Sequence, residues 1–175
     1  YRYGKNGYVF FKDTSDFQHT NINSEYIEQC ADNVENIYNY CRLNGIDFYF
    51  ICTPAKYSVY GEHMPYGLNV NGRMSNYEHL YQALEKRKVP QIRLLDKFLE
   101  KKKDMHLFNV KYDAGHWNAN GAFLGYKIII DNLKLKHKDI VSLEIEDFEI
   151  TKVFKDSLPV SYFKINEYVP FYKFL

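Results

Sequence analysis

The chain has 175 residues, which is enough for one domain with a buried core. Hydrophobic residues make up 46% of it and charged residues 26%, a balance typical of globular proteins and not of disordered or membrane-spanning chains. Lys and Arg number 23 against 22 Asp and Glu, so the formal net charge is only +1. No overall field attracts polyanions, and we expect no nucleic-acid partner.

Aromatic residues are abundant, with 17 Tyr and 13 Phe. Tyr has an apolar face and a hydrogen-bonding tip, which suits contact with sugar rings, but an AT-rich genome would produce the same enrichment. The three cysteines form no metal-binding pattern. Cys30 and Cys41 are separated by roughly 16 Å on a predicted helix, which is too far for a disulfide, so we expect free thiols.

The first third of the chain predicts a strand, a helix and a second strand. Gly4–Gly7 predicts a turn, and the aromatic, β-branched residues after it predict a short strand. Residues 24–44 repeat apolar side chains every three or four positions, which predicts an amphipathic helix that ends at Gly45. The nearly continuous apolar run 46–53 is typical of a strand covered on both faces in a parallel sheet.

The middle of the chain alternates loops with short elements. Lys56 and Tyr60 follow the predicted strand at its carboxyl end, where open α/β sheets bind ligands. A Gly- and Asn-rich loop over 65–74 precedes a capping box at Ser75–Glu78 that predicts a helix. Residues 89–94 predict a short edge strand, and a helix is expected over 95–103.

The last third contains the motif that we expect to carry the chemistry. Residues 107–112 predict an extended approach to Tyr112-Asp113-Ala114-Gly115-His116-Trp117-Asn118, which holds the chain's one tryptophan. An amphipathic helix follows, with Asn118 or Asn120 as its cap. Beyond residue 138 the sequence is strand-like and aromatic, without a clear helix. Alternating helices and apolar strands predict an α/β fold.

Asp113 and His116 form a candidate acid–base pair. A carboxylate can hold one nitrogen of the imidazole ring and leave the other free to move a proton. A helix-capping Asp beside a surface His explains the same residues without catalysis. The remaining histidines are scattered, with no spacing suited to a catalytic metal, and the chain lacks a phosphate-binding glycine loop, so no metal or cofactor is expected.

Three blocks in order resemble the alginate O-acetyltransferase-like branch of the SGNH-hydrolase-like proteins. The first is Gly4-Lys5-Asn6-Gly7-Tyr8-Val9-Phe10, similar to that family's G-K-D-G-W-L-F opening. The second runs from Gly45-Ile46-Asp47-Phe48 through Pro54-Ala55-Lys56, Val59-Tyr60 and Met64-Pro65. The third is the Asp113–Asn118 motif with Gly121-Ala122, similar to the family's T-D-x-H-W-N … G-A. Together the blocks cover roughly residues 1 to 135.

This resemblance implies a three-layer α/β/α flavodoxin-like domain with a mostly parallel sheet, incomplete in this chain, over residues 1–138. Residues 139–175 would be a strand-rich, aromatic extension of the same domain. The implied activity is acetyl transfer or acetyl-ester hydrolysis on an exported or cell-surface polysaccharide by a Ser-His-Asp triad, in the periplasm or outside the cell. The acetyl donor would be delivered by a membrane partner protein.

For the site, the resemblance implies catalytic roles for Asp113 and His116. We assign Trp117, Lys56 and Tyr60 to substrate binding, while packing under the imidazole is the alternative for Trp117. No metal and no cofactor is assigned.

Two features depart from the family pattern. The family spaces its pair D-x-H, whereas Asp113 and His116 are spaced D-x-x-H, as in ordinary SGNH esterases. The family also carries its serine after this block on a G-[DT]-S turn, but the last glycine here is Gly125. Three serines elsewhere lack a glycine-bearing turn: Ser15, Ser58 and Ser157.

Two explanations of the missing serine are open: the chain ends before it, or the protein does no acyl chemistry. Because the chain begins with Tyr1 and shows no signal peptide, we expect a piece of a longer protein whose serine lies beyond Leu175. The alternative is a non-catalytic carbohydrate-binding or polysaccharide-export scaffold, or a protein-interaction domain, on the same fold.

Overall fold

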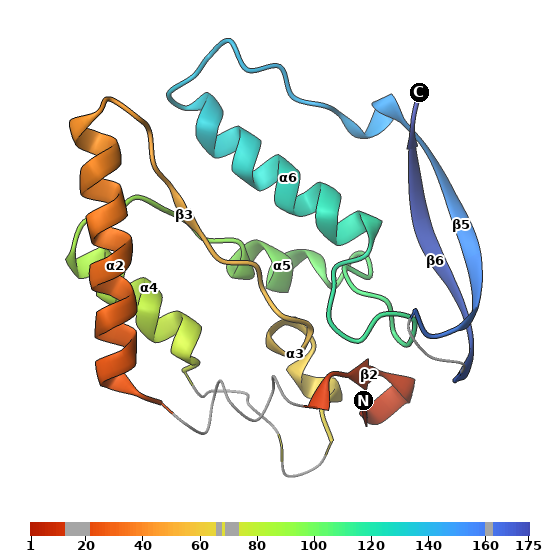
Figure 1. Cartoon of the computed structure of the whole chain (residues 1–175). Coiled ribbons are helices and arrows are strands. Elements are labelled where there is room, and N and C mark those ends of the chain that lie inside the picture. The colour runs from red at the N-terminus through yellow and green to blue at the C-terminus, as the bar shows by residue number, and fades with distance from the viewer. Residues whose placement is uncertain (13–21, 66–67, 69–73, 160–162) are drawn as a thin grey trace. The chain divides into compact units, whose positions relative to one another are not determined.

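The computed structural model describes residues 1–12, 22–65, 68, 74–159 and 163–175 (Figure 1). Contacts within the chain divide it into two compact units, which we describe separately. Unit 1 contains Tyr1–Phe11, Pro54–Asn69 and Leu94–Leu175, and unit 2 contains Lys12–Thr53 and Val70–Arg93. Ser15 and most of the predicted loops 13–23 and 65–74 lie outside the described residues.

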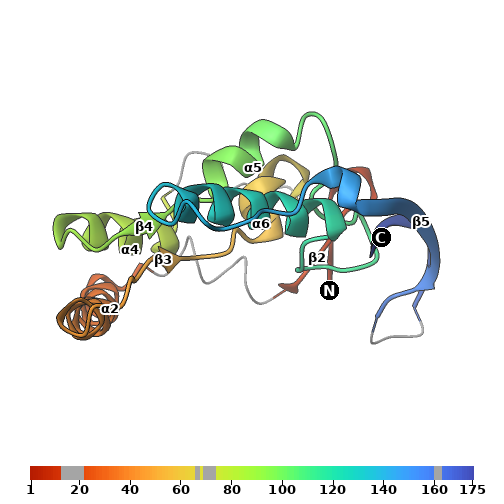
Figure 2. The same ribbon diagram turned by 90° about the horizontal axis from the view of Figure 1, so that it is seen from above.

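Unit 2 is built around two helices that lie side by side (Figures 1 and 2). Helix α2 (Ser24–Leu43) confirms the predicted periodic helix, and Gly45 after it has a φ of +69°. Helix α4 (Asn76–Lys86) begins where the capping box predicted, because the Ser75 side chain accepts a hydrogen bond from the Glu78 amide. The other half of the box is replaced by an ion pair between Glu78 and Arg93.

The core of unit 2 forms where the apolar stripes of α2 and α4 meet. Its buried members are Ile27, Ala31, Ala83, Leu84 and Val89. Strands β3 (Phe50–Ile51) and β4 (Gln91–Ile92) pair in parallel next to it. The run 46–53 predicted a strand buried on both faces, but β3 has only two residues and both are half-buried. Tyr81 supports the pair, donating from its hydroxyl to the Ile92 carbonyl and accepting from the Cys52 amide.

The amino-terminal part of unit 1 is a small antiparallel ribbon. Strand β1 (Arg2–Tyr3) pairs with β2 (Val9–Phe10), and the 3-10 turn η1 (Lys5–Gly7) connects them. Gly7 adopts a φ of +78°, a conformation that side chains with a Cβ disfavour, so the predicted glycine turn is confirmed. Val9 and Phe10 are fully buried, because β2 lies against the segment that leads to the Asp113–His116 motif.

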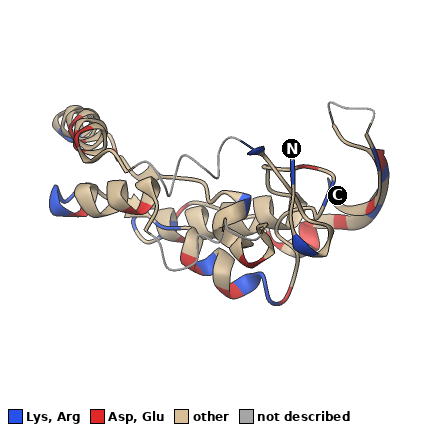
Figure 3. Ribbon diagram, turned by 90° about the horizontal axis from the view of Figure 1, so that it is seen from below, with Lys and Arg blue, Asp and Glu red and all other residues tan. Residues whose placement is uncertain are grey.

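The helices of unit 1 are α3 (Lys56–Val59), α5 (Leu95–Lys101) and α6 (Ala119–Lys134), with a 3-10 turn η2 at Gly61–His63. Asn118 caps α6, which decides between the two predicted caps. Figure 3 shows acidic and basic residues interspersed along the described ribbons. No described helix is long and apolar enough to cross a membrane.

The carboxyl-terminal part of unit 1 is a long antiparallel hairpin, as its strand-like sequence predicted. A 3-10 turn η3 (Ile145–Asp147) leads into β5 (Phe148–Ser157), which pairs with β6 (Lys164–Phe174). The pairing shifts register between Lys155 and Ser157, and Figure 2 shows the hairpin as a curved ribbon. Among the described strands only β3 and β4 pair in parallel, so the mostly parallel three-layer sheet stays a prediction.

Candidate active site

Asp113 and His116 lie on a loop that enters α6, and their side chains meet. The His116 Nδ1 atom is 2.9 Å from Asp113 Oδ2 and 3.1 Å from Oδ1. Asp113 Oδ1 also accepts from the backbone amides of Gly115 and His116, each at 3.0 Å. The carboxylate thus folds its own turn, and that turn brings a histidine three residues later onto the same carboxylate.

The charges of the pair suit proton transfer. Burial raises the pKa of Asp113, but the amides of Gly115 and His116 and the imidazole outweigh it and hold this pKa below its ordinary value. The carboxylate is therefore ionised at neutral pH. An ionised carboxylate on Nδ1 selects the tautomer with the proton on that nitrogen and leaves Nε2 as the proton acceptor. The His116 side chain is 82% exposed, so Nε2 is accessible to a reactant.

Backbone contacts close the loop that carries the pair. Phe108 and Trp117 form an isolated antiparallel bridge, and the Asn118 amide donates to the Leu107 carbonyl at 3.0 Å. Asn118 is buried and holds both sides of this closure. Its Oδ1 accepts from the Gly121 amide as the cap of α6, and its Nδ2 donates to the His106 carbonyl. The loop ends are therefore fixed independently of the Asp113 side chain.

Trp117 packs within unit 1. Its indole Nε1 donates to the Pro54 carbonyl at 2.9 Å, and its ring lies 4.8 Å from the Phe98 ring. Gly125 allows this approach, since a Cβ there would lie 2.6 Å from the indole. These contacts pack the indole against Pro54 and Phe98, while packing under the imidazole and contact with a sugar ring both stay predictions.

Lys56 is buried, with 1% of its surface exposed. Its Nζ donates to three backbone carbonyls, at 2.8 Å from Val9, 3.0 Å from Val110 and 3.2 Å from Asp113. Burial lowers the pKa of Lys56 to about 8, against the opposing effect of the carboxylates of Glu167 and Asp113. The ammonium thus holds the backbone of the segment that leads to Asp113. Substrate binding by Lys56 stays a prediction, and this geometry favours a supporting role.

Tyr60 is also buried, at 3% exposure. Its hydroxyl accepts a hydrogen bond from the Leu107 amide at 3.1 Å, and its ring packs against Tyr8 and Phe108. Burial raises the pKa of the Tyr60 hydroxyl. Tyr60 thus supports the start of the segment that leads to Asp113. Its predicted contact with substrate is a separate role, which the structure leaves as a prediction.

Glu167 is a residue of this site that the sequence did not reveal. Its carboxylate accepts from three consecutive amides: Val110 at 2.6 Å, Lys111 at 2.8 Å and Tyr112 at 2.7 Å. It comes from β6, more than 50 residues further along the chain. The residues around it gave only strand-like and aromatic character, and no local pattern links a glutamate to a distant loop.

Ser58 and Ser157, the candidate serines that the structure describes, make no hydrogen bond to the imidazole. In the described part of the chain, the hydrogen bonds of the His116 ring all go to Asp113. Ser157 donates to its neighbour Asp156, and Ser58 lies half-buried in the short helix α3. The described residues therefore present an acid and a base, and neither Ser58 nor Ser157 completes a triad with them.

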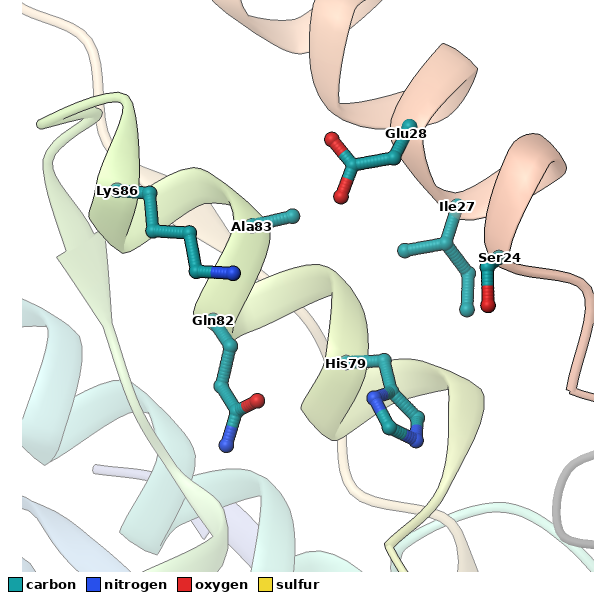
Figure 4. A pocket seen from close by; sticks show the side chains of 7 residues that line it. All are labelled: Ser24, Ile27, Glu28, His79, Gln82, Ala83 and Lys86. Carbon is teal, nitrogen blue, oxygen red and sulfur yellow. The ribbon is translucent and has the colours of Figure 1, made fainter.

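Two other features bear on cofactors and ligands. The described residues contain no group of three or more His, Cys, Asp or Glu placed to hold a metal ion. A hollow of about 80 Å³ in unit 2 is lined by side chains of α2 and α4, among them Glu28, His79 and Lys86 (Figure 4). It has room for little more than a few water molecules and contains neither member of the acid–base pair.

Comparison with known proteins identifies the family. The family model of the SGNH hydrolase-like domain of the acetyltransferase AlgX matches residues 2–161. The chain therefore belongs to this family of SGNH hydrolase-like domains. A search of curated proteins gave no match.

Solved structures with the same fold are distant in sequence. Bacillus cereus PatB1 matches with a TM-score of 0.72 and 17% identity, over 97% of this chain and 57% of that one. PatB1 with a sulfonyl adduct matches with a TM-score of 0.69 and 18% identity, over 90% of this chain and 52% of that one. The O-acetyltransferase domain of Pseudomonas putida AlgJ matches with a TM-score of 0.66 and 14% identity, over 98% of this chain and 63% of that one. The chain thus has the SGNH-hydrolase-like fold and spans between half and two thirds of these structures.

Proposed function

We propose that this chain is part of an enzyme that transfers acetyl groups to, or removes them from, a polysaccharide. The observation that carries the proposal is the 2.9 Å contact between His116 Nδ1 and Asp113, with the rest of the imidazole exposed. Membership of the acetyltransferase AlgX family supports the acetyl group as the transferred unit. Asp113 and His116 are two members of a Ser-His-Asp triad, and the serine comes from outside these 175 residues.

In this mechanism His116 moves one proton back and forth. Its Nε2 takes the proton from the serine hydroxyl as the serine oxygen attacks the acetyl carbonyl, and then returns it to the oxygen of the departing alcohol. The second half repeats these steps, with a sugar hydroxyl or water giving its proton to Nε2 as it attacks the acetyl-serine. Asp113 stabilises the imidazolium that forms in both halves.

We extend the proposal to the complete fold, the substrate, the location and the acetyl donor. In this proposal β3 and β4, which pair in parallel, belong to a larger, mostly parallel sheet between two helical layers. The substrate is an exported polysaccharide, the enzyme works in the periplasm or outside the cell, and a membrane partner delivers the acetyl donor. In this proposal three residues act on substrate binding indirectly, by supporting the loop that carries Asp113 and His116. They are Lys56, Tyr60 and Trp117.

The test is acetyl-ester turnover by the full-length protein. We expect it to release p-nitrophenol from p-nitrophenyl acetate and, with oligosaccharides present, to give products heavier by one acetyl group in mass spectrometry. Because a sugar hydroxyl competes with water for the acetyl-serine, the ratio of acetylated sugar to free acetate separates a transferase from an esterase. Oligosaccharide binding with no turnover of any acetyl ester would contradict the proposal and support the scaffold alternative.

A further inference from the structure

The segment immediately before Asp113 is held by two opposite charges from distant parts of the chain. The Glu167 carboxylate accepts the amides of residues 110–112, and the Lys56 ammonium binds the carbonyls of Val110 and Asp113. Three consecutive amides that converge on one anion form a compact nest, and hydrogen bonds to a charged acceptor are the stronger kind. The backbone of this segment is thus fixed on its amide side and on its carbonyl side.

The hairpin that carries Glu167 makes further contacts with the same region. Lys155, which pairs with Glu167 across the hairpin, places its ammonium 4.8 Å from the centre of the Tyr112 ring. Near the end of β6, the Tyr172 hydroxyl donates to Asn120 at 2.9 Å, at the start of α6. The hairpin therefore contacts the loop that carries Asp113 and His116 on both sides of the pair, just before Asp113 and just after His116.

Resting on the function proposed above, we propose that Glu167 is a positioning residue for the Asp113–His116 pair. Asp113 orients the imidazole, and Glu167 orients the backbone from which the Asp113 carboxylate projects. Misplacing a catalytic group by about 1 Å can cost up to about 100-fold in rate. The three hydrogen bonds from backbone amides to Glu167 therefore affect the turnover number by fixing the position of Asp113. The carboxyl-terminal hairpin is then a working part of the active site.

The test is Glu167→Gln in the full-length protein, with p-nitrophenyl acetate as substrate. Glutamine has one acceptor oxygen in place of two and presents N–H groups to backbone amides, so at least one amide loses its partner. We expect kcat to fall between about 10-fold and 100-fold with KM changed less than roughly 2-fold. Glu149→Gln makes the same change at an exposed site on β5 and is expected to leave kcat within about 2-fold.

A double-mutant cycle separates positioning from a general loss of structure. If Glu167 acts through Asp113, then Glu167→Gln will cost less than about 3-fold in kcat when Asp113→Asn is already present. Glu167→Asp keeps the charge and both oxygens, and we expect it to restore part of the activity. Equal costs in the two backgrounds, or full activity of Glu167→Gln, would overturn the inference.

Two further observations keep the outcomes distinct. If Glu167→Gln does not fold, hydrogen exchange in the unaltered protein tests the inference instead. The amides of Val110, Lys111 and Tyr112 must then be protected from exchange by their hydrogen bonds to Glu167. Fast exchange of these amides overturns the inference. Acetyl-ester turnover that survives His116→Ala contradicts the proposed function itself. Turnover that is lost in His116→Ala but unaffected by Glu167→Gln contradicts only the positioning role.

Discussion

Replacing His116 by Ala in the full-length protein is expected to lower acetyl-ester turnover by roughly 10⁵-fold or more. In the proposed mechanism the imidazole accepts the serine proton, and its Nδ1 lies 2.9 Å from the ionised carboxylate of Asp113. The side chain is 82% exposed, so its loss removes little packing and the fold should be kept. The measurement is kcat on p-nitrophenyl acetate, with thermal unfolding of the same preparation.

His79→Ala is the matched control for this experiment. His79 belongs to α4 in unit 2 and lines the small hollow beside α2, whereas Asp113 and His116 belong to unit 1. We expect kcat to stay within about 2-fold of the unaltered protein, because removing a histidine from this helix changes no group in the proposed reaction. Turnover that survives in His116→Ala would show that the imidazole is not the catalytic base.

Replacing Lys56 by Met is expected to lower the free energy of unfolding of unit 1 by roughly 2 to 4 kcal/mol. Methionine fills a similar volume but leaves the carbonyls of Val9, Val110 and Asp113 without their shared donor. The one tryptophan of the chain, Trp117, lies in the same unit, so urea unfolding followed by tryptophan fluorescence measures this loss. Lys97→Met, at an exposed lysine of α5, should leave the urea midpoint unchanged.

The contribution of Lys56 to the free energy of unfolding should also depend on pH. Burial lowers the pKa of Lys56 to about 8 in the folded chain, from about 10.5 when unfolded. Between these values the unfolded chain binds more protons than the folded chain, so this lysine makes folding more favourable as the pH rises from 8 towards 10.5. The stability of the unaltered chain relative to Lys56→Met should therefore increase over that range. A difference that falls or stays constant would contradict the lowered pKa of Lys56.

Local patterns in the sequence predicted α2, α4, α5, α6 and the Asp113–His116 pair, whereas the short helix α3 was not predicted. The apolar spacing of residues 24–44, the Ser75 cap and the Asn118 cap each depend on neighbours within a turn or two of helix, so the sequence itself carries the information. The Asp113–His116 contact is equally local, because the carboxylate folds the three-residue turn that brings the ring back to it.

Long-range contacts could not be predicted in the same way. Lys56 followed a strand in the region where ligands bind, which predicted a substrate contact, yet its ammonium is bound to carbonyls 47 to 57 residues away. No sequence pattern predicted the contacts of Glu167, because its partners are backbone amides, which every residue except proline carries. The strand over 46–53 was predicted too long, because apolar character indicates burial without fixing how many residues pair.

The central claim is that the Asp113–His116 pair activates a serine of the same protein, and covalent labelling tests it most directly. A sulfonyl fluoride reacts with a serine whose hydroxyl is activated by a base. After incubation of the full-length protein, mass spectrometry should find one sulfonylated serine, formed at least about 100-fold more slowly in His116→Ala. No serine adduct, or equal labelling rates in the two proteins, would contradict the claim.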